Sequence, residues 1–390
     1  MASPTTIALA SPIVNKDDLV LIQSPRPVHL AATRLNHAEW GKKTAVADYL
    51  IREHALLSSE LTKQAHTSWA LMHKDHAEKW AKRVDPIEAD DENQPPILAA
   101  CEAFIRPAVV KLSGSAEVEE QESVMISIGS VFVQAKHRGK GYAQTLMVKL
   151  REWMLAQYPQ GGFSNLYSDI GPKFYSRLGW QVYPSSSLKC LDVSTTTTTQ
   201  AADNNSSVQH LDRAAVDAAL FALDPMPFGT TKSVVAMPFR PATMDWFIRR
   251  SHYYYSLAEF AKPALGLPAH FGARTQDGSG LVIWNHLPEP STLYLIHLRF
   301  DSIATLSALL DASAAEAKRW GLAKLEAYLS VEQEHRLREW EQQGKLGQGW
   351  SVVEREQSLS SLMVWKQGGQ LVENPSAEWD WVGNERYAWV

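Results

Sequence analysis

The chain has 390 residues, of which 45% are hydrophobic, and this length predicts two packed domains rather than one. Its formal net charge is −5, from 38 basic and 43 acidic residues, so the composition offers no basic face for a nucleic-acid partner. The only cysteines, Cys101 and Cys190, exclude a disulfide framework and a cysteine-rich metal site.

The composition also argues against a membrane protein. No apolar run reaches the roughly 18 residues that a membrane helix needs, and the first residues lack the pattern of a signal peptide. We therefore expect a cytoplasmic protein without a membrane partner. The histidines scatter without the spacing of metal ligands, so we expect no metal.

Apolar spacing predicts the elements of the first half of the chain. In chain order these are a strand at 28–33, a helix over about 36–57, and strands at 67–72, 97–112 and 125–134. The polar residues 74–94 and the acidic residues 114–123 separate them and predict solvated excursions.

A glycine turn follows the strand at 125–134. Residues 138–143 read Arg-Gly-Lys-Gly-Tyr-Ala and precede an apolar helical run at 145–154. Glycine lets the backbone come close to a ligand, and the unpaired N–H groups at a helix start favour an anion, so the segment predicts a pyrophosphate cradle. The alternative is a plain strand-to-helix turn. Other phosphate loops fit worse, because Gln144 stands where a dinucleotide fingerprint has its third glycine.

A second pattern follows at 163–180. It comprises a predicted strand at 163–170, then Gly171-Pro172, and a short helix at 173–178 that ends at Gly179. Arg138-x-x-Gly141-x-Ala143 and the later Phe-Tyr-Ser-Arg-Leu-Gly-Trp segment together resemble the GNAT superfamily of N-acetyltransferases.

This resemblance implies an α/β fold with a mixed sheet and acetyl-CoA as the acetyl donor. It also implies that the backbone of the strand before the turn binds the pantetheine arm. The predicted cofactor contacts are Val131, Phe132, Val133, Arg138, Gly139, Lys140, Gly141, Tyr142, Ala143 and Ser168.

Further phrases narrow the resemblance. Ala100-Cys-Glu102, Arg106-Pro107 and the segment at 166–171 are similar to the fungal lysine N6-acetyltransferases that begin lysine degradation. The implied reaction is acetylation of a small-molecule amine, the N6-amine of free L-lysine, by direct transfer with a general base. Two alternatives remain open. One is a protein or peptide lysine acetyltransferase with an acidic loop at 117–122, and the other is a non-catalytic acyl-CoA-binding module.

Three residues are candidates for the chemistry. The motif places the Tyr175 hydroxyl near the leaving sulfur, where a phenol that is protonated at neutral pH can serve as general acid. Glu102 and Asp169 interrupt apolar strands, where a buried carboxylate needs a purpose, and either could receive the proton of the amine. The alternatives are a core tyrosine and outward-facing or paired carboxylates, with Arg106 or Arg177 as partners.

The polar residues 191–207 predict a linker between a domain at 1–190 and a domain at 208–390. The second half repeats the strand and helix order of the first, with strands at 270–274, 281–284, 292–300, 324–331 and 359–365 and helices at 303–320 and 334–343. Residues 299–303 contain no glycine, so we expect a degenerate GNAT-like domain that shapes the acceptor site and binds no cofactor. Arg249, Arg250 and the tyrosines at 253–255 are either part of a pocket wall or core and solvated face.

Overall fold

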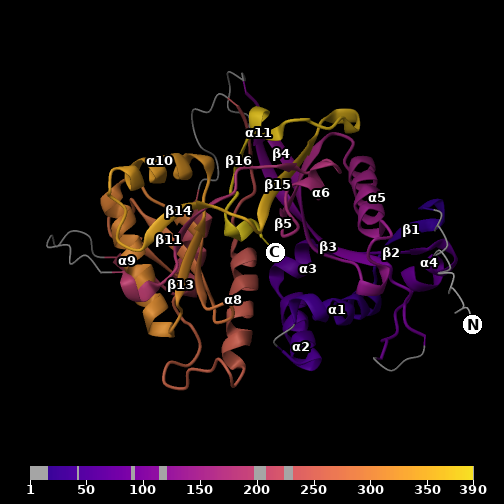
Figure 1. Cartoon of the computed structure of the whole chain (residues 1–390), viewed down its shortest axis with the longest axis horizontal. Coiled ribbons are helices and arrows are strands. Elements are labelled where there is room, and N and C mark those ends of the chain that lie inside the picture. The colour runs from indigo at the N-terminus through magenta and orange to yellow at the C-terminus, as the bar shows by residue number, and fades with distance from the viewer. Residues whose placement is uncertain are drawn as a thin grey trace, which may run out of the picture.

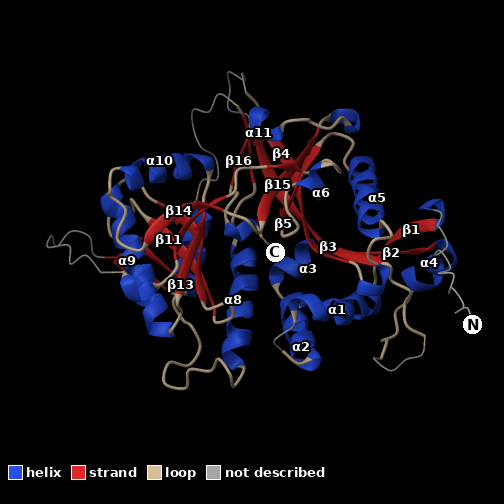
Figure 2. Cartoon of the chain, viewed as in Figure 1, coloured by secondary structure: helices blue, strands red, loops and turns tan. Residues whose placement is uncertain are grey.

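The computed structural model describes residues 16–41, 44–88, 93–113, 121–196, 208–223 and 232–389. Figure 1 shows two sheets side by side, with helix α8 (Pro241–Ser256) and the C-terminal end of the chain between them. The expected mixed α/β class is confirmed, because each sheet contains parallel and antiparallel pairs and carries helices (Figure 2). Most of the expected acidic loop at 117–122 and of the expected linker at 191–207 lies outside the described residues.

The first sheet draws strands from both halves of the chain. Its order is β1-β2-β3-β4-β5-β15-β6, and β9 pairs with both β3 and β16. The strand bounds are Leu19–Gln23 for β1, His66–His73 for β2, Ala99–Lys111 for β3, Gln121–Phe132 for β4, Gly162–Ser168 for β5, Gln181–Val182 for β6, Ser233–Ala236 for β9, Leu359–Trp365 for β15 and Trp379–Val382 for β16.

The second sheet has the order β14-β7-β13-β12-β11-β10-β8. Its strand bounds are Ser186–Cys190 for β7, Val208–Leu211 for β8, Gly272–Thr275 for β10, Leu281–Leu287 for β11, Thr292–Arg299 for β12, Lys324–Tyr328 for β13 and Trp350–Glu354 for β14.

The helices other than α8 are α1 (Arg26–Trp40), α2 (Val46–Leu57), α3 (Glu60–Ala65), α4 (Lys74–Ala81), α5 (Tyr142–Gln157), α6 (Lys173–Ser176), α7 (Arg213–Ala222), α9 (Ile303–Trp320), α10 (Val331–Gln342) and α11 (Pro375–Glu378). Helix α5 packs on β1, β2 and β3, and α9 packs on β10 to β13. None of the described helices combines the length and the apolar character that a bilayer span requires.

The predicted boundary near residue 200 does not separate the two sheets. Strand β7 comes before it and belongs to the second sheet, whereas β9, β15 and β16 come after it and belong to the first. One hydrophobic cluster accordingly joins Phe104 of the first half to Trp246, Ile283 and Leu362 of the second. The two halves of the chain therefore share a core, because each sheet contains strands from both halves.

The predicted strand at 28–33 is wrong, because these residues lie in α1. A proline at the first positions of α1 favours a helix start, and Val28, Ala31 and Ala32 are buried at helical spacing. The predicted helix over 36–57 is two helices, since α1 ends at Trp40 and α2 begins at Val46. The polar excursion at 74–94 contains α4, whose only buried residue is Trp80.

In the second half the predicted helix at 303–320 is confirmed as α9 with the same bounds. The strand at 359–365 is confirmed as β15, but it pairs with β5 and β6 of the first sheet rather than closing the second. Strand β12 runs parallel to β13 with α9 between them, as β4 runs parallel to β5 with α5 between them. The second GNAT-like unit is therefore present.

Candidate active site

The predicted strand, turn and helix are present, and two glycines shape the turn. Gly139 and Gly141 have φ values of 78° and 80°, and Gly141 immediately precedes α5. A side chain is strained at such angles, which is why the turn needs glycine. Gly141 offers no side chain to cap the helix, so the first N–H groups of α5 remain open to an anion.

A lysine from the beginning of the described chain lies beside this turn. A Cβ added to Gly141 would stand 3.8 Å from Lys16 Nζ, in the 3-10 helix η1 (Lys16–Asp18). Arg138 folds back on the turn and donates to the carbonyl of Val133 at 3.2 Å. Because the guanidinium of Arg138 is also paired with the carboxylate of Glu39, Lys16 is the one of these two cations that adds to the attraction of the helix start for a phosphate. The sequence analysis missed Lys16, which is distant from the turn along the chain.

Strand β4 separates from β5 just before the turn. The two strands pair only as far as Ile128 and Leu166, although β4 continues to Phe132 beside β3. A bulge interrupts the β3–β4 pairing, and Ser130 in it has a φ of 52°. From Gly129 onward the edge of β4 that faces β5 has no strand partner among the described residues. Strands β4 and β5 thus splay apart, which leaves main-chain groups of β4 for the pantetheine arm that the resemblance implies.

A cavity of about 810 Å³ begins at this open edge and reaches helices α2 and α8. Its size lies within the range of ligand sites in proteins. The predicted site residues that line it are Glu102, Val131, Phe132, Val133, Arg138, Ala143, Asp169 and Tyr175.

The other predicted cofactor contacts do not line this cavity. Gly139, Lys140 and Gly141 form the turn beside it, and Tyr142 turns its side chain into the core, where it is 5% exposed. Ser168 is buried and its hydroxyl donates to the carbonyl of Gly171 at 2.8 Å. Gly139, Gly141 and Tyr142 can therefore contact a ligand through their main-chain groups.

Tyr175 lies in α6 and is only 8% exposed, in the cavity wall. Burial raises the pKa of its phenol well above the ordinary value, and the neighbouring Cys101 and Asp169 act in the same direction. Its hydroxyl has no hydrogen-bond partner among the described residues. The phenol is thus protonated at neutral pH and free to donate.

Glu102 lies on β3 at the bulge and contacts two histidines. Its Oε1 is 3.0 Å from Nε2 of His66 and 3.6 Å from Nε2 of His29, and Nδ1 of His29 is 2.9 Å from the hydroxyl of Ser68. The carboxylate side chain is 21% exposed. The sequence expectation of a carboxylate set into an apolar strand is confirmed for this residue.

The environment keeps Glu102 ionised. Burial alone would raise its pKa, but the hydrogen bond from His66 and the charges of His29 and His66 lower the pKa to about 2. Burial lowers the pKa of His29 to about 4, against the opposing attraction of Glu102. At neutral pH the cavity therefore contains a carboxylate beside a neutral His29.

The expectation for Asp169 rested on a buried position inside a strand, and that premise is wrong. Strand β5 ends at Ser168, so Asp169 lies in the following loop and is exposed. Its Oδ1 accepts from the main-chain N–H of Ser358 at 2.8 Å. The suggested structural partner Arg106 also serves elsewhere, since it donates to the Ser127 hydroxyl and the Ala388 carbonyl.

The far wall of the cavity consists of α2, α8 and the end of the chain. Arg52 donates to Glu53 at 2.7 Å and to the hydroxyl of Tyr254 at 2.9 Å. Arg250 lies 5.0 Å from the ring of Trp389. Arg52 and Glu53 escaped the sequence analysis, because nothing in their spacing on α2 shows that α8 will pack against them.

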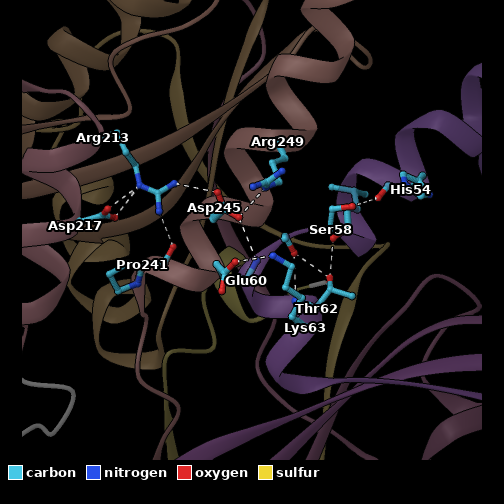
Figure 3. Close-up of polar contacts among 12 residues, drawn as sticks. His54, Ser58, Glu60, Thr62, Lys63, Arg213, Asp217, Pro241, Asp245 and Arg249 are labelled. Atoms are coloured by element: carbon cyan, nitrogen blue, oxygen red, sulfur yellow. Dashed lines mark hydrogen bonds and ion pairs between the residues drawn. The ribbon is translucent and has the colours of Figure 1, made fainter.

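Polar contacts hold this wall together across the two halves (Figure 3). Asp245 on α8 accepts from the main-chain N–H of Glu60 on α3 at 3.3 Å and from Arg249 at 2.8 Å. Arg213 on α7 lies 3.6 Å from the same carboxylate and bonds Asp217 at 2.8 Å. The network fixes α8 against α3, and the residues facing the cavity are therefore held in place.

Two clusters have the spacing of metal ligands. In His29, His66 and Glu102 the ligand atoms all lie within 4.8 Å of one another, and so do those of His210, His270 and Glu316. In the first cluster, His66 is hydrogen-bonded to Glu102 and His29 to the hydroxyl of Ser68. The expectation of no metal stays a prediction.

Comparisons with known proteins agree with the GNAT-like fold described above. Residues 191–390 match the family model described as the LYC1 GNAT-like C-terminal domain. A protein of Yarrowia lipolytica named lysine acetyltransferase is 26% identical over 363 residues, which cover 80% of this chain and 84% of that protein.

Two solved structures share the fold. A GCN5-related N-acetyltransferase from Kribbella flavida has a TM-score of 0.51 at 17% identity, covering 92% of this chain and 72% of that one. A protein of Enterococcus faecalis described as a probable N-acyltransferase also has a TM-score of 0.51, at 10% identity, covering 89% of this chain and 72% of that one.

Proposed function

The chain belongs to the GNAT acetyltransferase family that carries the LYC1 GNAT-like C-terminal domain, and from this premise we propose that it acetylates the N6-amine of free L-lysine with acetyl-CoA. One observation carries the proposal. The cavity connects the open edge of β4 to Glu102 and then to a wall with charges of both signs. A small molecule with a cationic chain and a zwitterionic end matches that order of groups. The reaction would serve lysine degradation.

Acetyl-CoA would be held by the first half of the chain. The glycine turn and the first N–H groups of α5 suit its pyrophosphate, with Lys16 and Arg138 as nearby cations. The unpaired edge of β4 from Gly129 suits the amides of the pantetheine arm. A main-chain N–H on the same edge would polarise the thioester carbonyl.

The chemistry then requires two proton movements. The lysine amine attacks the thioester carbonyl, a C–N bond forms, and the C–S bond breaks. Tyr175 donates its proton to the departing thiolate, which its raised pKa and free hydroxyl permit. Glu102, with a pKa of about 2, attracts the lysine ammonium without taking up its proton. The ammonium loses one proton to solvent before the amine attacks, and the proton lost from nitrogen after the C–N bond forms replaces the one that Tyr175 gives to sulfur. Asp169 remains a candidate with less support, since it is exposed and bonded to Ser358.

The test is release of CoA thiol from acetyl-CoA by the full chain with a panel of amines. We expect turnover with L-lysine at a kcat/KM at least about 100-fold above that for a lysine within a basic peptide. Mass spectrometry of the product should show acetylation at the side-chain nitrogen. A preference for the peptide would identify a protein acetyltransferase instead.

Calorimetry with acetyl-CoA separates the remaining alternative. Binding of acetyl-CoA without turnover on any amine of the panel would identify a non-catalytic acyl-CoA-binding module. An absence of both would refute the placement of the cofactor at the glycine turn.

A further inference from the structure

The wall of the cavity on α8 contains a guanidinium without a polar partner. Arg250 makes no hydrogen bond and no ion pair with the described residues, and its Nε is buried without a hydrogen-bond partner. Its contacts are with the rings of Trp246, at 5.4 Å, and Trp389, at 5.0 Å. Buried polar groups are nearly always satisfied, so this donor calls for a partner that the described residues do not supply.

Two further guanidinium groups act on Arg250, against the opposing effects of Tyr254 and Glu53. The neighbouring Arg52 is neutralised by Glu53, whereas Arg386 donates to a phenol, that of Tyr328. The pKa of Arg250 is lowered by burial first, and the charges of Arg52 and Arg386 act in the same direction. An anion bound at Arg250 would relieve both the desolvation and the repulsion.

A carboxylate with one oxygen left unpaired in the described part of the chain lines the same cavity as this guanidinium. Glu53 uses one oxygen, Oε1, for both bonds from Arg52, and its Oε2 has no partner among the described residues. Burial raises the pKa of Glu53, and the charge of Arg52 opposes that shift. Glu53, Glu102 and Arg250 all line the same cavity. A cation at Oε2 would favour its ionised form.

We propose that Arg250 binds the α-carboxylate of the acceptor amino acid and that Glu53 binds its α-ammonium. The inference rests on the proposed function and adds to it the residues that recognise the substrate as a free amino acid. A guanidinium matches a carboxylate through two parallel hydrogen bonds, and a buried carboxylate is the natural partner of an ammonium. The side-chain amine is then left to reach Glu102 and the open edge of β4.

This arrangement explains how free lysine is distinguished from other amines. A lysine inside a peptide has neither a free α-carboxylate nor an α-ammonium, so it would leave Arg250 and the Oε2 atom of Glu53 without a ligand partner in the cavity wall. Cadaverine lacks only the carboxylate, and 6-aminohexanoate lacks only the α-amine. The two compounds therefore probe the two contacts separately.

The experiment compares kcat/KM for L-lysine, cadaverine and 6-aminohexanoate in the full chain and in variants. In Arg250→Gln we expect the ratio of lysine to cadaverine to fall about 30-fold, because a charged hydrogen bond is lost. In Glu53→Gln we expect the ratio of lysine to 6-aminohexanoate to fall by about 10-fold or more. Arg249→Gln is the matched control, since Arg249 adjoins Arg250 on α8 but bonds Asp245 and is absent from the cavity lining. It should keep both ratios of the wild type.

The outcomes separate the two proposals. If the wild type acetylates lysine while Arg250→Gln preserves the ratio of lysine to cadaverine, this inference is wrong and the proposed function stands. If the wild type acetylates none of the three amines, the proposed function fails and the inference fails with it. Acetyl-CoA affinity and Tm report whether each variant is folded. If Arg250→Gln does not fold, Arg250→Lys tests the same ratio. We expect an intermediate fall, because a single ammonium replaces the planar guanidinium and its two parallel hydrogen bonds.

Discussion

The two strand–helix–strand units of this chain start from the same backbone plan. In the first, β4 pairs with β5 up to Ile128 and then continues beside β3 only; in the second, β12 pairs with β13 up to Leu295 and continues to Arg299. Both units also carry an irregularity in pairing with the preceding strand at that point. A splay between parallel strands is therefore common to both halves.

The units differ where the helix begins. Helix α5 follows the glycine turn, and Gly141 leaves its first N–H groups open. Helix α9 follows Ser302, whose hydroxyl accepts from the N–H of Thr305 at 3.2 Å. The position that could receive a phosphate in the first unit is thus closed by a side chain in the second.

They differ again in what fills the splay. In the second unit α10 places Gln333 against the carbonyl of Leu298 and Arg336 against the carbonyl of Asp301, the latter at 2.7 Å. In the first unit the corresponding edge of β4 opens on the cavity. The comparison favours the first unit as the one that binds a cofactor, because its helix start has no side-chain cap and the described residues do not fill its splay.

The largest expected effect tests a group that only the first unit has. Tyr175→Phe removes the free phenol beside the cavity, and α10 of the second unit contains no tyrosine. We expect kcat on lysine to fall about 100- to 1,000-fold, the range for losing a general acid, with little change in acetyl-CoA affinity.

Tyr255→Phe is the control for that change. Tyr255 is buried in the second core, and its hydroxyl is unsatisfied among the described residues, so kcat should stay within about threefold of wild type. A comparable loss in both variants would show that Tyr175 acts through packing rather than by proton donation.

The next effect concerns cofactor binding. Gly141→Val places a branched side chain at a φ of 80° and beside Lys16, so we expect the acetyl-CoA Kd to rise by about 100-fold or more. Wild-type calorimetry should give a stoichiometry of one acetyl-CoA per chain. Retention of one tight site in Gly141→Val would mean that the second unit binds the cofactor, contrary to the difference between the two helix starts.

A third prediction uses the buried histidines of the two halves. Burial lowers the pKa of His29 to about 4 from an ordinary 6.5, so between these values the unfolded chain binds a proton that the folded chain does not. The free energy of unfolding should therefore decrease as pH falls from 6.5 to 4, with a contribution of up to about 1.4 kcal/mol per pH unit. His29→Gln should remove that contribution in urea titrations across the window.

Part of the pH dependence should survive His29→Gln. In the second half, burial also lowers the pKa of His286, which lies 2.9 Å from Glu316, and this pair contributes in the same direction. An identical pH slope in wild type and His29→Gln would contradict the assignment of His29 as neutral in the folded cavity.

The sequence predicted single helices, strands and turns correctly in several places, but it did not predict which strands and helices pack together. Helix α9 was predicted to the residue, because its apolar spacing lies between Ser302 and Gly321, a cap and a terminator. The glycine turn and Tyr175 were found from short motifs. By contrast β15 was found as a strand but assigned to the wrong sheet, since strand partners are chosen by tertiary packing that local spacing does not encode.

The far wall of the cavity also could not be predicted from local sequence patterns. Arg52 and Arg250 come from helices far apart in the chain, and they share a cavity only because α2 and α8 pack together. The structure also revised Asp169, because the strand predicted to end at residue 170 ends at Ser168. Element ends are the least reliable part of such predictions, and a carboxylate at an end changes from buried to exposed with a shift of one position.

The smallest expected effect concerns Ser302, the N-terminal cap of α9. It tests whether this cap alone prevents the second unit from binding a cofactor. Ser302→Ala removes the bond to the N–H of Thr305 and should lower the free energy of unfolding by about 1 kcal/mol, while Ser302→Gly should cost only a few tenths. Neither variant should gain a second acetyl-CoA site by calorimetry, because Gln333 and Arg336 still occupy the splay. A second site in Ser302→Gly would mean that the capping side chain, and not α10, is what separates a cofactor-binding unit from its degenerate partner.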